Sequence, residues 1–179
     1  MSFVATLSIL SALKTAIAAI NLPSSYAAIA GYPKAFPAVE IYAQENLMKA
    51  FDDLLIVEDR ACFIIPGGDT HDSARDGAVV KTARASEVHL LLTDRDYNRA
   101  QAELVGGAEA PGVIALKDIL IDALIWKNLS IHGVLLLPTT GDPMALSDKD
   151  KENAPGRAAW VQTFTTNAGS MKSTTPARL

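Results

Sequence analysis

The side chains of this chain that could support nucleophilic chemistry are one cysteine and one histidine. Cys62 lies in the apolar run of residues 61–65, and His89 lies in a second apolar run, residues 87–93. If these runs are neighbouring strands, the imidazole could activate the thiol. A buried thiol beside a hydrogen-bonded histidine is the commoner arrangement in such runs, and the sequence contains no Gly-x-Ser-x-Gly elbow. We therefore expect no catalytic residue here.

A second group of chemically competent side chains lies between residues 69 and 77. It contains Asp69, His71, Asp72 and Asp76, whose carboxylate and imidazole groups are suitable metal ligands. Their spacing matches neither the calcium-binding loop nor the zinc-binding helix with two histidines four residues apart. The tip of a solvated, charged loop accounts for them more simply. The sequence therefore predicts no metal ligand.

Two other features are typical of ligand sites but have ordinary structural explanations. Pro66-Gly67-Gly68 has the glycines of a phosphate-binding loop without its Gly-Lys-Ser/Thr ending, so we expect a turn that ends a strand. Trp126 and Trp160 could stack on a ligand, but large aromatic rings in apolar runs usually pack in a core or an interface. We assign no cofactor-binding residue and expect no cofactor.

Composition bounds the class of protein. The chain has 179 residues, of which 49% are apolar and 20% charged, which is typical of one globular domain with its own core. A net charge of −4 with scattered basic residues disfavours a general nucleic-acid binder. The apolar stretch 2–20 lacks a preceding basic residue and is interrupted by Lys14. We therefore expect no secretory signal, no membrane span and an origin in the cytosol.

Helical periodicity in the apolar residues indicates three helices, at residues 3–20, 40–54 and 113–126. The first should bury one face, made of Phe3, Leu7, Leu10, Leu13 and Ile17. The third should bury Val113, Leu116, Leu120 and Leu124 and leave Asp118 and Asp122 in solvent. Its remaining positions are also largely apolar, namely Ile114, Ile121 and Ile125. We therefore expect this helix to be covered on more than one side, partly by another subunit.

Strand character appears in four runs, at residues 61–65, 87–93, 133–138 and 159–166. The polar residues 69–77 between the first two runs indicate a hairpin with an extended arm at 66–80. Residues 139–156 form a second polar loop, and residues 167–179 are expected to fray. The predicted fold class is α+β, an antiparallel or mixed sheet of about four strands with helices packed on one side.

Read in order, residues 40–167 resemble the tail terminator and tail completion proteins of long-tailed bacteriophages of the Mu-like type. The resemblance is carried by four segments: Arg60-Ala-Cys-Phe-Ile-Ile-Pro-Gly-Gly68, Val88-His-Leu-Leu-Leu-Thr-Asp-Arg95, Ile119-Leu-Ile-Asp-Ala-Leu-Ile125 and Trp160-Val-Gln-Thr-Phe164. In the family, the helix of the third segment often ends at a Gly-Trp pair. Here Trp126 is present and the glycine is not.

The resemblance implies a structural virion protein without enzymatic activity. Members of the family form hexameric rings that cap the tail tube, stop its polymerisation and bind the neck or head-completion proteins. It divides the chain into an N-terminal helix and proline-rich loop (1–37, a possible docking element), a tail-terminator-like domain (38–167) and a flexible tail (168–179). DNA would pass through the lumen without specific binding, which the mild negative charge allows.

Two other functions are compatible with the sequence. A head-side connector or stopper of the phage neck shares the same general features and cannot be separated from a tail terminator by pattern alone. A small intracellular α/β enzyme, of hydrolase-like type, would use Cys62 and His89 or the acidic residues 69–76. Each function predicts a different observation: a ring at the tail end, a ring at the head vertex, or a reactive thiol or bound metal.

Overall fold

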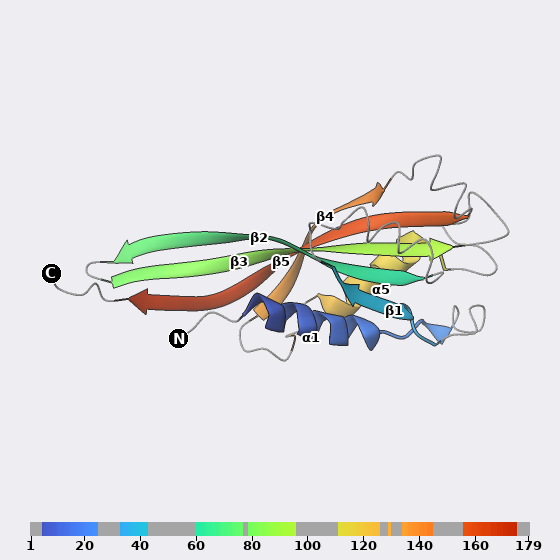
Figure 1. Ribbon diagram of the computed structural model, residues 1–179, viewed down its shortest axis with the longest axis horizontal. Coiled ribbons are helices and arrows are strands. Elements are labelled where there is room, and N and C mark those ends of the chain that lie inside the picture. The colour runs from blue at the N-terminus through green and yellow to red at the C-terminus, as the bar shows by residue number, and fades with distance from the viewer. Residues whose placement is uncertain are drawn as a thin grey trace.

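The computed structural model describes residues 5–24, 33–42, 60–76, 79–95, 111–125, 129, 134–144 and 156–174. Their elements, in chain order, are helix α1 (Thr6–Ala18), strands β1 (Ala38–Ile41), β2 (Ala61–Asp76) and β3 (Val79–Arg95), helix α5 (Val113–Leu124), and strands β4 (Val134–Met144) and β5 (Arg157–Thr174). Figure 1 shows one continuous twisted sheet with the helices gathered at one end of it. The α+β class is confirmed.

The five strands form one mixed sheet in the order β1-β2-β3-β5-β4. Strand β1 pairs in parallel with β2, and all other neighbours are antiparallel. The strand that the sequence analysis did not predict is β1 (Ala38–Ile41), and the helix expected at residues 40–54 would have begun inside it. Pairing with the first residues of β2 supplies its hydrogen bonds, and this long-range contact outweighs local helical preference. The rest of the predicted helix 40–54 lies outside the described residues.

Both described helices cover the same face of the sheet, as expected. Their buried residues join one core cluster with strand residues such as Leu90 and Phe164, and the helical members are Ile9, Leu10, Leu13 and Ile17 of α1 and Leu116, Leu120 and Leu124 of α5. The predicted apolar face of the first helix was wrong at Leu7, which is 69% exposed, because Ile9 takes part in the core instead. On α5, Asp118 and Asp122 are exposed as predicted.

The outer side of α5 is less open than its composition indicates. Ile114, Ile121 and Ile125 are half-buried within the chain itself. Ile121 packs against the core cluster. Cover on more than one side of the helix is thus confirmed, whereas a contribution from another subunit stays a prediction.

The opposite face of the sheet carries a smaller apolar cluster. Its buried members are Ala61, Phe63, Ile65, Leu91 and Ala159, which come from β2, β3 and β5. Tyr42 packs against Phe63 with the two rings tilted by 57° and their centroids 4.9 Å apart. Because side chains alternate between the faces of a strand, these residues interleave along the chain with those of the main core.

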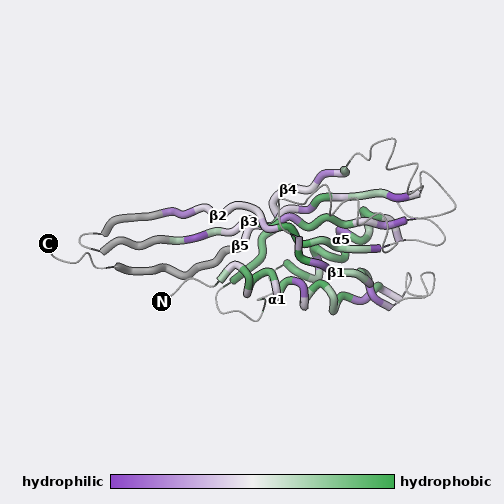
Figure 2. Tube along the Cα trace, in the orientation of Figure 1, coloured by the Kyte–Doolittle hydropathy of each residue, from purple (hydrophilic) through white to green (hydrophobic). Residues whose placement is uncertain are grey.

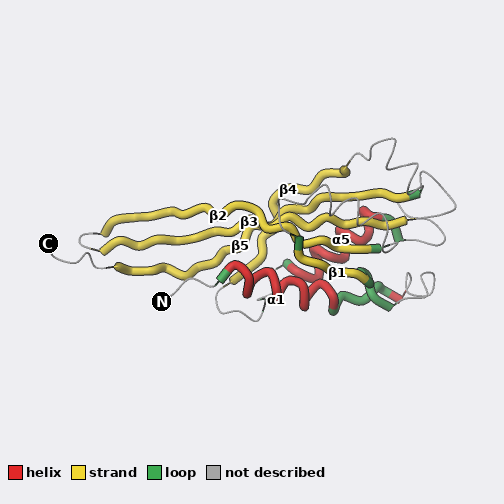
Figure 3. The backbone as a smooth tube through the Cα atoms, viewed as in Figure 1, coloured by secondary structure: helices red, strands yellow, loops and turns green. Residues whose placement is uncertain are grey.

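Three strands continue far beyond the helix-covered part of the sheet and form an arm (Figures 1 and 3). We define the arm as residues 69–76 of β2, 79–86 of β3 and 167–174 of β5, and the rest of the described chain as the body. The hairpin arm predicted at 66–80 is confirmed, but residues 69–76 are a strand and not a loop. Residues 167–174 are likewise a strand, so the predicted boundary at 168 falls inside β5.

The arm joins the body at irregular strand pairing. The register of β2 with β3 shifts between Pro66 and Asp69, and that of β3 with β5 shifts between Thr82 and Arg84. Pro66-Gly67-Gly68 therefore forms a bulge within a strand, and the expectation that it ends the strand was wrong. A bulge accommodates a proline and bends the ribbon without ending it.

Strand β4 also runs further than the sequence indicates. It continues through Pro138 to Met144, into the predicted polar loop 139–156, with a register shift against β5 between Pro138 and Gly141. As the outermost strand of the sheet, β4 tolerates prolines, whose missing N–H groups need not pair inward. Residues 145–155 lie outside the described part of the chain.

The segment after α1 is tied to the body. Leu22 donates its backbone N–H to the carbonyl of Pro33, and Ala35 donates to Ile20. Phe36 and Val39 then complete the main core cluster. The helix of residues 1–37 is thus part of the folded core, and its possible docking role stays a prediction.

Candidate functional site

The sheet separates the two side chains that could have formed a catalytic dyad. Cys62 is paired with Leu92, and Ile65 with His89, so the cysteine and histidine project from opposite faces. Cys62 is fully buried in the main core, and this burial raises the pKa of its thiol far above the ordinary value. His89 instead contacts Thr163, with its Nδ1 3.0 Å from the hydroxyl oxygen. This arrangement contradicts a Cys62–His89 dyad.

The acidic residues 69–76 are spread along a strand. Asp69 lies 3.9 Å from the guanidinium of Arg84 on the neighbouring strand β3. Asp69 and Asp72 are three positions apart on β2, so they project to opposite faces. Across the described residues, no three His, Cys, Asp or Glu side chains gather as metal ligands would.

Trp160 packs at the edge of the main core. Its ring faces α5, where the ammonium of Lys117 lies 5.4 Å from the ring centroid. Gly141 of β4 approaches its indole so closely that a Cβ at this glycine would lie 2.9 Å from Nε1. This packing accounts for Trp160 as a structural residue. Trp126 lies outside the described residues.

A buried polar group at the end of β3 was not anticipated from the sequence. The carboxylate of Asp94 accepts hydrogen bonds from the backbone N–H groups of Gly112 at 2.8 Å and Arg95 at 3.0 Å. Gly112 has a φ of 81°, in the left-handed region that favours glycine, and it is the residue from which α5 begins. Asp94 thus fixes the start of α5 to the sheet. The available signal was an acidic residue directly after an apolar strand.

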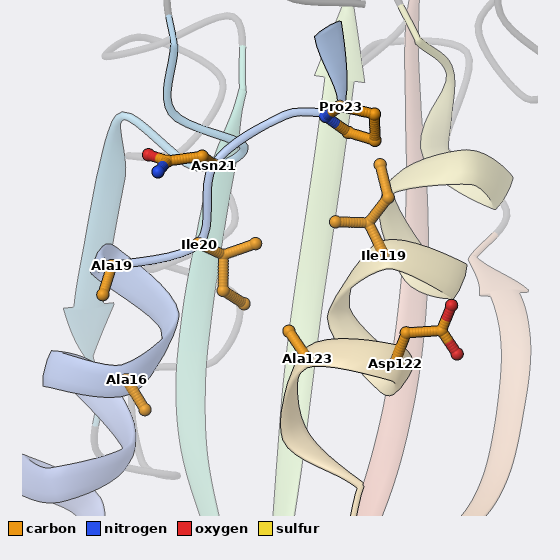
Figure 4. Close-up of a pocket in the computed structure, with 8 residues that line it drawn as sticks. All are labelled: Ala16, Ala19, Ile20, Asn21, Pro23, Ile119, Asp122 and Ala123. Carbon is orange, nitrogen blue, oxygen red and sulfur yellow. The ribbon is translucent and has the colours of Figure 1, made fainter.

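A groove of about 460 Å³ lies between the end of α1 and α5 (Figure 4). Small or apolar side chains form most of its lining, such as Ala16 of α1, Ala19 directly after this helix, and Ile119 and Ala123 of α5. Its polar groups include the carboxylate of Asp122, which is exposed. These side chains offer contact surface without a nucleophile or a general base in a fixed position.

The arm is the second candidate surface for binding a partner, after the groove. Residues 68–72 of β2 are exposed in succession, so both faces of this strand meet solvent at the base of the arm. In Figure 2 this part of β2 is hydrophilic, in contrast with the apolar body. The sequence had placed a solvated polar segment here, and the structure turns it into an ordered strand.

Comparison of the chain with protein-family models finds no match, and comparison with curated proteins finds none either. Among the described helices, none combines the length and apolar character needed to cross a membrane. The described part of the chain thus offers two candidate surfaces for binding, the groove and the arm.

Proposed function

We propose that this chain is a structural subunit of a bacteriophage virion. In this proposal, copies form a ring that caps the tail tube, terminates its polymerisation and joins the tail to the neck or head-completion proteins. The subunit has no catalytic activity and no cofactor. It is made in the host cytoplasm and becomes part of the tail or neck.

The arm is the observation that carries the proposal. An eight-residue extension of β2 spans about 26 Å at the rise of a β-strand, and two further strands accompany it. In Figure 1 it extends from the body, away from both helices. A polar extension of this kind adds little to the stability of the body, but it provides the long contact surface that ring subunits and their neighbours require.

The distribution of chemistry supports an assembly role. The thiol is sealed in the core, and the histidine lies on the other face of the sheet. The described surface exposes one large apolar side chain, Leu7. Contacts between copies must therefore use polar surface or backbone hydrogen bonds in addition to apolar patches. The resemblance of residues 40–167 to tail terminators and the confirmed fold class are compatible with this role.

The proposal is tested by adding the purified protein to its tail tube protein during tube growth. We expect shorter tubes of more uniform length, each with the added protein at one end, measured by negative-stain electron microscopy with a labelled chain. Tubes of unchanged length that carry no label at their ends would contradict the proposal. A label found at the head vertex of assembled particles, with twelve-fold symmetry, would support the head-side connector instead.

The mass of the isolated protein provides a second measurement. Light scattering should detect a species several times the monomer mass of 19.0 kDa, alone or with the tube protein present. The enzyme alternative predicts a reactive thiol or a bound metal in place of a ring. A strict monomer in the presence of the tube protein would count against any ring.

A further inference from the structure

The outer edges of the body are protected against the addition of another strand. Strand β1 offers only four residues, and β4 carries Pro138 and Pro143 together with a register shift. Short strands, prolines and bulges are the features by which proteins keep sheet edges from pairing with other chains. Neither body edge therefore presents a long, regular ladder of backbone donors and acceptors.

The β2 edge of the arm has none of this protection, and the β5 edge has it only at residues 169–171, where its register with β3 shifts. Within the described chain, no strand pairs with the outer side of β2 at residues 69–76 or of β5 at residues 169–174. Neither segment contains a proline. An eight-residue edge presents about four N–H and four C=O groups outward, because alternate residues of a strand bond to each side. The arm therefore has two open edges, one on each side of β3, of which the β2 edge is regular over residues 69–76 and the β5 edge over residues 172–174.

The two edges differ in charge. Residues 69–76 include three aspartates and one arginine, a net charge of −2. Residues 167–174 include Lys172 and no acidic residue, a net charge of +1. Two copies that met through like edges would bring like charges together, which destabilises strand pairing, whereas unlike edges attract. The charges thus favour an asymmetric contact.

We propose that the β2 edge of one arm pairs with the β5 edge of the arm of a second copy. Each copy then uses both edges, one for each neighbour, which is the head-to-tail arrangement that closes into a ring. Strands β2 and β5 both run antiparallel to β3. If all arms point the same way, the new pair between copies is therefore parallel. This inference depends on the proposed function in one respect only, which is that the paired copies close into a ring.

Cysteine pairs test which edges meet. We would place one cysteine on each edge, as Ala74→Cys on β2 and Ser173→Cys on β5, and treat each protein with a short bifunctional maleimide. Ala74 and Ser173 both pair with Lys81 of β3, so they lie at the same level along the arm. Native Cys62 is buried and should not react while the protein is folded. Strands paired across the interface lie about 4.8 Å apart, within the reach of the reagent. We expect cross-linked dimers from the mixture of the two variants and only background from either alone. Dimers from a single variant, or none from the mixture, would overturn the proposal.

Charge reversal tests the basis of the asymmetry. Asp72→Lys leaves the β2 edge with a net charge of 0, and Lys172→Asp leaves the β5 edge with −1 against the −2 of β2. Each change should weaken self-association roughly threefold to tenfold, the first by removing attraction between the edges and the second by creating repulsion. A chain with both changes should associate more tightly than Lys172→Asp alone, since its neutral β2 edge no longer repels the β5 edge of its neighbour. Asp118→Lys, on the exposed side of α5, is the matched control and should change little. Association constants measured by sedimentation decide the outcome, and loss in the double variant equal to both single losses would contradict the pairing.

The same variants separate this inference from the proposed function. If Asp72→Lys leaves self-association unchanged while the unmodified protein still caps tubes, the edge pairing is wrong and the function stands. If the cross-links form as expected but the unmodified protein never reaches tube ends, the edge pairing stands and the tail function is wrong.

Discussion

The body and the arm share three strands but are stabilised in different ways. In the body, β2, β3 and β5 bury apolar side chains on both faces, against the helices on one side and in a smaller cluster on the other. In the arm, the described side chains of β2 are exposed and polar, and the strands are held mainly by pairing with each other. Figure 2 shows this change of hydropathy along β2.

The difference indicates separate roles for the two regions. Apolar burial contributes most of the free energy of folding, so the body determines whether the chain folds. A ribbon of polar strands contributes little to that free energy but offers its backbone edges to other molecules.

The thiol of Cys62 should report how completely the body is sealed. In the folded protein we expect its alkylation near pH 8 to be at least about a thousandfold slower than in denaturant, since reaction requires unfolding. Burial raises the pKa of this thiol above its ordinary value of 9.0. The stabilisation that comes from this pKa shift is therefore fully present below pH 9.0. It is lost as the pH rises toward the pKa of the thiol in the folded protein. Mass spectrometry of the labelled protein measures the rates. Rapid labelling of the folded chain would mean that the body opens locally.

Matched truncations in the two regions should differ by several kcal/mol. Phe164 is fully buried in the main core, and Phe164→Ala should lower the free energy of unfolding by about 3–5 kcal/mol through lost burial and a cavity. His71 is exposed on the arm, so His71→Ala should change it by less than about 0.5 kcal/mol. Urea denaturation followed by circular dichroism measures both. Equal losses would show that the arm is part of the cooperative core.

Removal of the Asp94 carboxylate should destabilise the part of the body at the C-terminal end of β3, where α5 begins. Asp94→Ala leaves the buried N–H of Gly112 without its acceptor, at a cost of about 3 kcal/mol. Amide exchange should accelerate first in α5, because this bond fixes the start of that helix. Exposed Asp118 on the same helix provides the control, since Asp118→Ala removes a carboxylate that no buried group requires. Similar exchange rates in both variants would show that Asp94 does not anchor α5.

Much of the body could be predicted from the sequence because apolar spacing determines it. The periodicity at Leu116, Leu120 and Leu124 gave the buried face of α5, and four apolar runs marked parts of β2 to β5 that lie in the body. These patterns are local and strong, since burial imposes a period of 3.6 on a helix and of two on a strand. The number of strands was underestimated because β1 is short and gains its stability from β2.

Neither the strands of the arm nor the position of Cys62 relative to His89 could be predicted from apolar spacing. Polar residues such as Asp69 to Asp76 are typical of loops, and only pairing with β3 makes them a strand. The separation of Cys62 from His89 depends on strand register, which neither apolar run specifies by itself. The open edges of the arm exist because β1 and β4 do not extend along it, and the length of these neighbouring strands is a property of the whole sheet.

The junction between the two regions contains a pair of glycines that should respond in opposite directions. At Gly67 a Cβ would lie 2.8 Å from the backbone oxygen of Glu87, so Gly67→Ala must displace β3 and should cost about 2 kcal/mol. At Gly68 no atom lies within 4 Å of such a Cβ, and its φ is not in the left-handed region. Gly68→Ala should therefore stabilise the protein by about 0.5 kcal/mol, because alanine has fewer conformations to lose on folding. Thermal unfolding of the two variants measures both changes. If Gly67→Ala were as harmless as Gly68→Ala, the bulge would tolerate displacement, and the arm would not be held at a fixed angle to the body.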